Sequence, residues 1–152
     1  MTAPILIFGW GNPGRGDDAL GPLFVEHIEA LGLPNVECLT DFQLQVEHAL
    51  DLQNRQHILF VDASFSAPAP FSTRLLAPGR DASFSSHAIT PQSVMQVYVD
   101  LHNERPPPCH LLAIRGERFE LGEGLSPAAA SHLEAALRWA DDWLKSPGSA
   151  DQ

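Results

Sequence analysis

Short runs of apolar residues alternate along this chain with segments whose apolar residues recur at helical spacing. Runs that are apolar throughout are typical of parallel strands that are covered on both faces. We therefore expect strands at 4–8, 36–40, 57–61, 73–77 and 109–114.

Four segments between and after these runs have features of helices. We expect helices over 17–31, after Asp41 as an N-cap, from Thr90-Pro91 and from Ser126-Pro127. The apolar residues of the helix expected over 17–31 should lie on one face, at Leu20, Phe24, Ile28 and Leu31. Those of the helix expected from Thr90-Pro91 should do the same, at Val94, Val97, Tyr98 and Leu101. The last helix should bury Ala130, Leu133, Leu137, Ala140 and Leu144.

This alternation predicts a single-domain α/β fold, a three-layer α/β/α sandwich with a mostly parallel sheet. We expect one domain over 1–145 and a flexible tail over 146–152. In such folds, ligands bind beyond the carboxyl ends of the strands. That rule draws attention to the residues after Phe8, near Asp41 and after Val61.

Charge and composition exclude several classes of function. The 152 residues include 9 basic and 19 acidic side chains, a formal charge of −10, which disfavours nucleic acid as the main partner. We find no signal-peptide pattern and no apolar run long enough for a membrane span. Cys38 and Cys109 lack a CxxC arrangement, so we expect reduced thiols in a cytoplasmic protein.

The glycine-rich segment 9–21, GWGNPGRGDDALG, is the first candidate site. Its glycine spacing fits neither a dinucleotide-binding fingerprint nor a P-loop, so a nucleotide-binding module is disfavoured. Asp17 and Asp18 would repel a phosphate but suit a cation. A plain alternative is that they cap the following helix, which needs only one of them.

Asp62 and His87 are the other candidate ligands. Asp62 follows a buried strand, where a carboxylate either belongs to a functional site or accepts hydrogen bonds from the amides of a loop. His87 lies in a polar loop, where a histidine is usually a solvent-exposed residue without a functional role. Together with the acidic pair they would form an oxygen and nitrogen ligand set that suits nickel or zinc. The remaining histidines are interpreted as surface or packing residues: His27, His48, His57, His102, His110 and His132.

These motifs together resemble the hydrogenase maturation protease family. The family's opening pattern is matched by Gly9, Gly11, Asn12, Asp17-Asp18 and Gly21. Two further landmarks of the family are matched by Val61-Asp62-Ala63 and by Ser85-Ser86-His87. The segments Asp41 to Leu50 and Arg115 to Gly122 resemble the branch that serves soluble, NAD-coupled hydrogenases.

The resemblance implies an aspartyl-type endopeptidase that trims the C-terminal extension of a nickel-loaded hydrogenase large-subunit precursor. It implies that Asp18, Asp62 and His87 contact the metal and that all three, with Asp41, form the catalytic site. Nickel would arrive with the substrate, and no permanently bound metal is required. The attacking water could be polarised by the metal or activated by Asp41.

Two other functions compete with this interpretation. A non-cleaving, nickel-dependent assembly chaperone would use the same ligands. A peptidyl-tRNA hydrolase shares the segment Gly9-Trp10-Gly11-Asn12-Pro13-Gly14, but this chain lacks the Thr-Arg-His-Asn segment that such enzymes carry next. The acidic net charge also disfavours a tRNA substrate.

Overall fold

The computed structural model describes residues 2–80 and 89–147. Its centre is a sheet of five strands in the order β2-β1-β3-β5-β4. All neighbouring pairs are parallel except β4 and β5, so the predicted mostly parallel sheet is confirmed. The strands are β1 (Ile5–Trp10), β2 (Val36–Asp41), β3 (His57–Ser64), β4 (Phe71–Leu75) and β5 (Cys109–Arg115).

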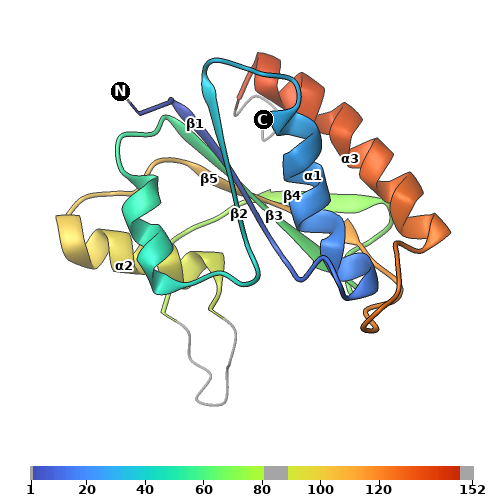
Figure 1. Cartoon of the computed structure of the whole chain (residues 1–152). Coiled ribbons are helices and arrows are strands. Elements are labelled where there is room, and N and C mark those ends of the chain that lie inside the picture. Colours follow the sequence, from blue (N-terminus) through green and yellow to red (C-terminus); the bar gives the residue numbers. More distant parts are fainter. Residues whose placement is uncertain (1, 81–88, 148–152) are drawn as a thin grey trace.

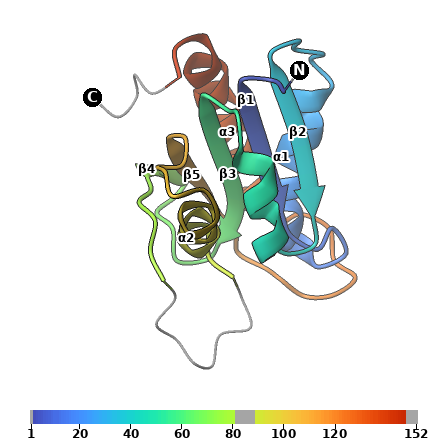
Figure 2. The same cartoon turned by 90° about the vertical axis from the view of Figure 1, so that its left-hand side faces the viewer.

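Helices cover both faces of this sheet, which confirms the predicted three-layer architecture. The helices α1 (Leu20–Glu29) and α3 (Pro127–Lys145) lie side by side on one face (Figure 1). The helix α2 (Pro91–His102) and the 3-10 helix η2 (Val46–Leu52) cover the other face, as the turned view in Figure 2 shows. A short 3-10 helix, η1 (Gly16–Ala19), precedes α1 directly.

Alternate residues of β1 supply both halves of the core. Ile5 and Ile7 pack with α1 and α3, whereas Leu6 and Phe8 pack with η2 and α2. All four side chains are buried, and burial of an aliphatic or aromatic side chain stabilises the fold by about 1.5–3 kcal/mol. The apolar run that predicted this strand therefore reflects its central position between two layers.

Several predicted boundaries were wrong, because local signals competed with one another. The segment that was expected to open a long helix at residue 17 forms η1 first, and α1 begins only at Leu20. Asp41 is not an N-cap: it ends β2, and Gln45 caps η2 instead. The strand expected at 73–77 lies at Phe71–Leu75.

The buried stripe of α3 also differs from the predicted one. Leu133 and Ala140 are buried as expected, but Ala130 is exposed. The helix turns Ala129, Ala136 and Trp143 toward the sheet instead. Leu31 and Leu101, each placed on a buried stripe by the periodicity, are exposed at the ends of their segments.

In residues 2–80 and 89–147, no helix combines the length and the apolar character needed to cross a membrane. The α3 helix ends at Lys145, and the predicted tail lies outside the described residues beyond Pro147.

The start of α1 lies directly against the backbone of the sheet. A Cβ atom added to Gly21 would lie 2.5 Å from the carbonyl oxygen of Trp10 and 3.0 Å from that of Val61. On the facing strand, a Cβ atom at Gly9 would lie 2.5 Å from the carbonyl oxygen of Gly21. These two glycines therefore set how closely α1 approaches β1 and β3.

Replacing Gly21 by Ala should destabilise the protein by at least about 2 kcal/mol, because both clashing atoms belong to the backbone. This effect opposes helix propensity, which favours Ala over Gly by about 1 kcal/mol. Urea unfolding would measure it, with Gly124→Ala as the control because a Cβ atom there meets nothing within 4 Å. Equal stability of the two variants would contradict the close packing.

Candidate functional site

Asp41 and Asp62 lie at the same level of the sheet, on the two strands that flank β1. Trp10 pairs with Asp41 across β1 and β2, and Gly9 pairs with Val61 across β1 and β3. Asp62 therefore stands beside Trp10 on the opposite side from Asp41. Two strand spacings separate the two aspartates, which is roughly 10 Å.

Both carboxylates emerge on the face that η2 and α2 cover. Side chains alternate between the faces of a strand, and Leu39 and Phe60 belong to the core cluster on that face. Asp41 and Asp62 are each two residues further along these strands. The carboxyl ends of the strands thus bring together two of the residues predicted from separate motifs.

Asp18 is held at the same edge by the loop that follows β1. Its Oδ2 atom accepts a hydrogen bond of 2.7 Å from the amide of Asn12. Gly11 has a φ of +147°, and a side chain there would collide with the carbonyl oxygen of Asp18. The glycine and asparagine of this motif therefore place Asp18, and they form no phosphate cradle.

The pKa of Asp62 is raised from its usual value of 3.8 to about 7. Burial is the main cause, a hydrogen bond from the amide of Ala63 opposes it, and the negative charge of Asp18 adds a smaller increase. Asp62 opens into a polar hollow of about 300 Å³, lined among others by Ser72 and Arg74. Two carboxylates under mutual repulsion form a site that a cation would stabilise.

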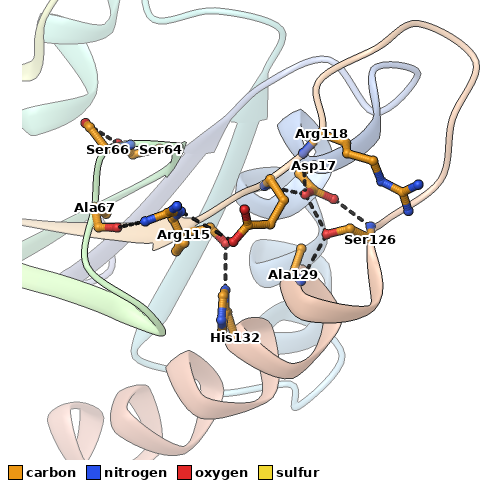
Figure 3. Close-up of polar contacts among 10 residues, drawn as sticks. Asp17, Ser64, Ser66, Ala67, Arg115, Arg118, Ser126, Ala129 and His132 are labelled. Atoms are coloured by element: carbon orange, nitrogen blue, oxygen red, sulfur yellow. Dashed lines mark hydrogen bonds and ion pairs between the residues drawn. The ribbon is translucent and has the colours of Figure 1, made fainter.

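Asp17, the other member of the acidic pair, has a structural role. Its side chain is completely buried. One of its oxygens, Oδ1, accepts from the amide of Ser126, and Oδ2 accepts from the Ser126 hydroxyl and from the amides of Glu117 and Arg118, at 2.7–3.0 Å (Figure 3). The Ser126 hydroxyl in turn caps α3 through the amide of Ala129.

This network outweighs the cost of burying the charge. Burial by itself raises the pKa of Asp17, but the hydrogen bonds from Ser126, Arg118 and Glu117 lower it below the usual value. The alternative of a simple helix cap is therefore wrong for Asp17: it joins η1 to the loop before α3, 109 residues away at Ser126.

Asp41 contacts a backbone amide and a histidine, and this histidine was not predicted as a site residue. Its Oδ1 atom accepts from the amide of Phe42 at 2.7 Å, and its Oδ2 atom lies 3.2 Å from Nε2 of His48. His48 was interpreted as a surface or packing residue. The local sequence offers only its position three residues after the cap residue Gln45. That spacing indicates a capping interaction with Gln45 and gives no hint of a contact with Asp41.

His87, the third predicted metal ligand, lies outside the described residues. In the part of the chain that the structure describes, no three His, Cys, Asp or Glu side chains cluster closely enough to hold a metal ion. The structure thus places Asp18, Asp41 and Asp62 at the same edge of the sheet. The assignment of His87 stays a prediction.

Replacing Asp17 by Asn should lower the free energy of unfolding by about 2–4 kcal/mol at neutral pH. The amide group would turn an NH₂ toward groups that are themselves donors. Chemical denaturation would measure the loss, with the exposed Asp142→Asn as the control. A loss as small as that of the control would show that the network does not stabilise the fold.

Replacing Asp62 by Asn should stabilise the protein at pH 8 but not at pH 4. The folded-state pKa is raised, so the folded protein binds the proton more tightly, and the stability due to Asp62 falls as the pH rises from about 4 to 7. The gain at pH 8 should be on the order of 2–4 kcal/mol. Urea unfolding at both pH values would measure it, and an equal effect at the two would contradict the raised pKa.

Comparisons with known proteins concern the fold as a whole. A scan against protein-family models and a search of curated proteins find no match. Among solved structures, the hydrogenase maturating endopeptidase HybD from E. coli matches with 26% identity and a TM-score of 0.73, over 95% of this chain and 93% of that chain. An endopeptidase from Escherichia coli matches with 28% identity and a TM-score of 0.72, over 95% and 93% of the two chains.

A [NiFe] hydrogenase maturation protease, HycI from Thermococcus kodakarensis KOD1, matches in fold with 22% identity and a TM-score of 0.72, over 94% of this chain and 93% of that chain. The folds that this chain matches over nearly its whole length are therefore those of hydrogenase maturation endopeptidases.

Proposed function

We propose that this protein is an endopeptidase that removes the C-terminal extension of a nickel-loaded hydrogenase large-subunit precursor. The observation that carries the proposal is the placement of Asp18 and Asp62 at the carboxyl edge of a fold that matches maturation endopeptidases. The two residues come from separate motifs, and the pKa of one responds to the charge of the other. A lone structural carboxylate would not require such a pair.

Nickel is part of the substrate in this scheme. Asp18 and Asp62 would contact the metal of the bound precursor, and the sequence adds His87 as a third contact. A divalent cation between the carboxylates would replace their repulsion by attraction and would favour the ionised form of Asp62. Precursor that lacks the metal would leave this repulsion in place, so the metal acts as a checkpoint for cleavage.

Asp41 is proposed as the general base. Its carboxylate is 37% exposed, so that a water molecule can reach it. A water molecule there would give a proton to Asp41 while its oxygen attacks the scissile carbonyl carbon. The C–N bond then breaks, and the proton passes to the leaving amine, so that one water is consumed for each peptide bond.

We also propose that the partner is a soluble, NAD-coupled hydrogenase, on the resemblance of the segments Asp41 to Leu50 and Arg115 to Gly122. The reaction would take place in the cytoplasm, where Cys38 and Cys109, both free of disulfides, would stay reduced. Burial raises the pKa of the Cys38 thiol to about 11 and that of Cys109 to about 12, so neither is suited to act as a nucleophile.

The test is a cleavage assay on the large-subunit precursor from the same organism, with and without nickel, read by mass spectrometry. We expect loss of a C-terminal peptide from the nickel-loaded precursor alone. Binding of the loaded precursor without any loss of mass would favour the assembly chaperone. Equal cleavage of both forms would contradict the metal checkpoint.

Asp18→Asn and Asp62→Asn should both reduce cleavage of nickel-loaded precursor by at least roughly 100-fold, because each removes a charge that faces the metal. Both variants should remain folded, as near-UV circular dichroism would check. Asp142→Asn, on the exposed side of α3, is the control and should cleave at the wild-type rate. Wild-type activity in either site variant would exclude that residue from the site.

A further inference from the structure

His48 is held so firmly that its ring can present only one nitrogen to Asp41. The ring is 14% exposed and packs edge-on against Phe8, with ring centroids 4.4 Å apart. Its Nδ1 atom accepts a hydrogen bond of 2.8 Å from the amide of Gln45. Two independent contacts, one apolar and one polar, therefore fix the orientation of the imidazole.

The hydrogen bond from Gln45 also fixes the tautomer. An amide N–H can only donate, so Nδ1 of His48 must carry a lone pair and not a proton. A neutral imidazole then carries its proton on Nε2, the atom that lies 3.2 Å from Oδ2 of Asp41. The nitrogen of His48 that lies near the carboxylate is thus the protonated one, and the ring is not a charged partner of Asp41.

The backbone around Asp41 is fixed as well. Its carbonyl oxygen accepts from the amide of Gly11 at 3.1 Å, and its Oδ1 atom accepts from the amide of Phe42. Each carboxylate oxygen has one polar contact and keeps a free lone pair. Rotation about the Cβ–Cγ bond would break both contacts, so the free lone pairs point in a constant direction.

We infer that His48 is a positioning residue: as the neutral Nε2–H tautomer, it orients the Asp41 carboxylate toward the scissile bond. This inference rests on the proposed function, in which Asp41 is the general base. His48 would touch neither substrate nor metal. Its loss should lower kcat and leave KM for the nickel-loaded precursor nearly unchanged, since misalignment of a base affects the chemical step.

Two substitutions separate the capping role of His48 from its positioning role. His48→Asn keeps an acceptor near the position of Nδ1, which retains the Gln45 bond, but it cannot reach Asp41. His48→Gln keeps a donor near the position of Nε2 but loses the bond from Gln45. Both variants lack the ring that packs on Phe8, so this loss is common to the pair.

The test compares both variants with wild-type protein and with the exposed His27→Asn control. We expect kcat to fall roughly 10- to 100-fold in His48→Asn and to recover substantially in His48→Gln, with all variants folded. The opposite order would show that only the cap matters. Equal losses in the two would assign the effect to the missing ring. Either result, or wild-type kcat in His48→Asn, would overturn the inference.

A second measurement does not depend on activity. The ¹⁵N shifts of the His48 ring in the wild-type protein should report a protonated Nε2 and an unprotonated Nδ1 at neutral pH, and this pattern should persist in Asp62→Asn. The opposite tautomer, or an imidazolium, would overturn the inference. If wild-type protein cleaves no precursor but shows the expected tautomer, the proposed function fails while the geometry at Asp41 stands.

Discussion

A buried carboxylate joins two segments of the chain that are about 100 residues apart in the sequence. Asp17 is completely buried and accepts four hydrogen bonds, which join η1 to the segment between β5 and α3. A buried charge is tolerated only when its partners are complete, and removal of one partner costs several kcal/mol. Because Asp18 is the next residue along the chain, this network also fixes the backbone of the candidate site.

The acidic pair thus divides structural and chemical roles between adjacent residues. Asp17 is satisfied by hydrogen bonds that lower its pKa, whereas the charge of Asp18 helps raise the pKa of Asp62. Asp17 stabilises the fold at neutral pH, whereas the effect of the Asp18 charge on Asp62 destabilises it. Such a cost is typical of functional sites, where a group is kept for its chemistry. In our proposal, the metal of the substrate supplies the missing countercharge.

The layers of the fold could be predicted from the sequence because burial on both faces makes a parallel strand apolar throughout, as at Ile5 to Phe8. Asp18 and Asp62 could also be predicted, since Asp18 lies in the loop after β1 and Asp62 near the carboxyl end of β3, at the edge where ligands bind. Asp17 could not be distinguished from Asp18 by sequence alone. Its partners are about 100 residues or more away, at Glu117 and beyond, and no local pattern encodes them.

The errors have a common physical cause. Asp41 was expected to cap a helix, but strand pairing with Trp10 retains it in β2, and Gln45 takes the cap. His48 was interpreted as a surface or packing residue, and it does pack on Phe8, but its contact with Asp41 depends on where η2 lies, which no local pattern encodes. The buried stripe of α3 shifted because the large side chain of Trp143 is buried against the sheet. In each case tertiary packing prevailed over local propensity.

The most direct test of the central claim is X-ray absorption spectroscopy at the nickel edge. Nickel-loaded precursor would be freeze-quenched with the Asp41→Asn variant, which retains Asp18 and Asp62 but lacks the proposed base. We predict that complex formation adds oxygen or nitrogen ligands to the nickel and that Asp62→Asn in the same background removes part of this change. A nickel spectrum that stays unchanged in a complex shown to form would contradict the claim that these carboxylates contact the metal.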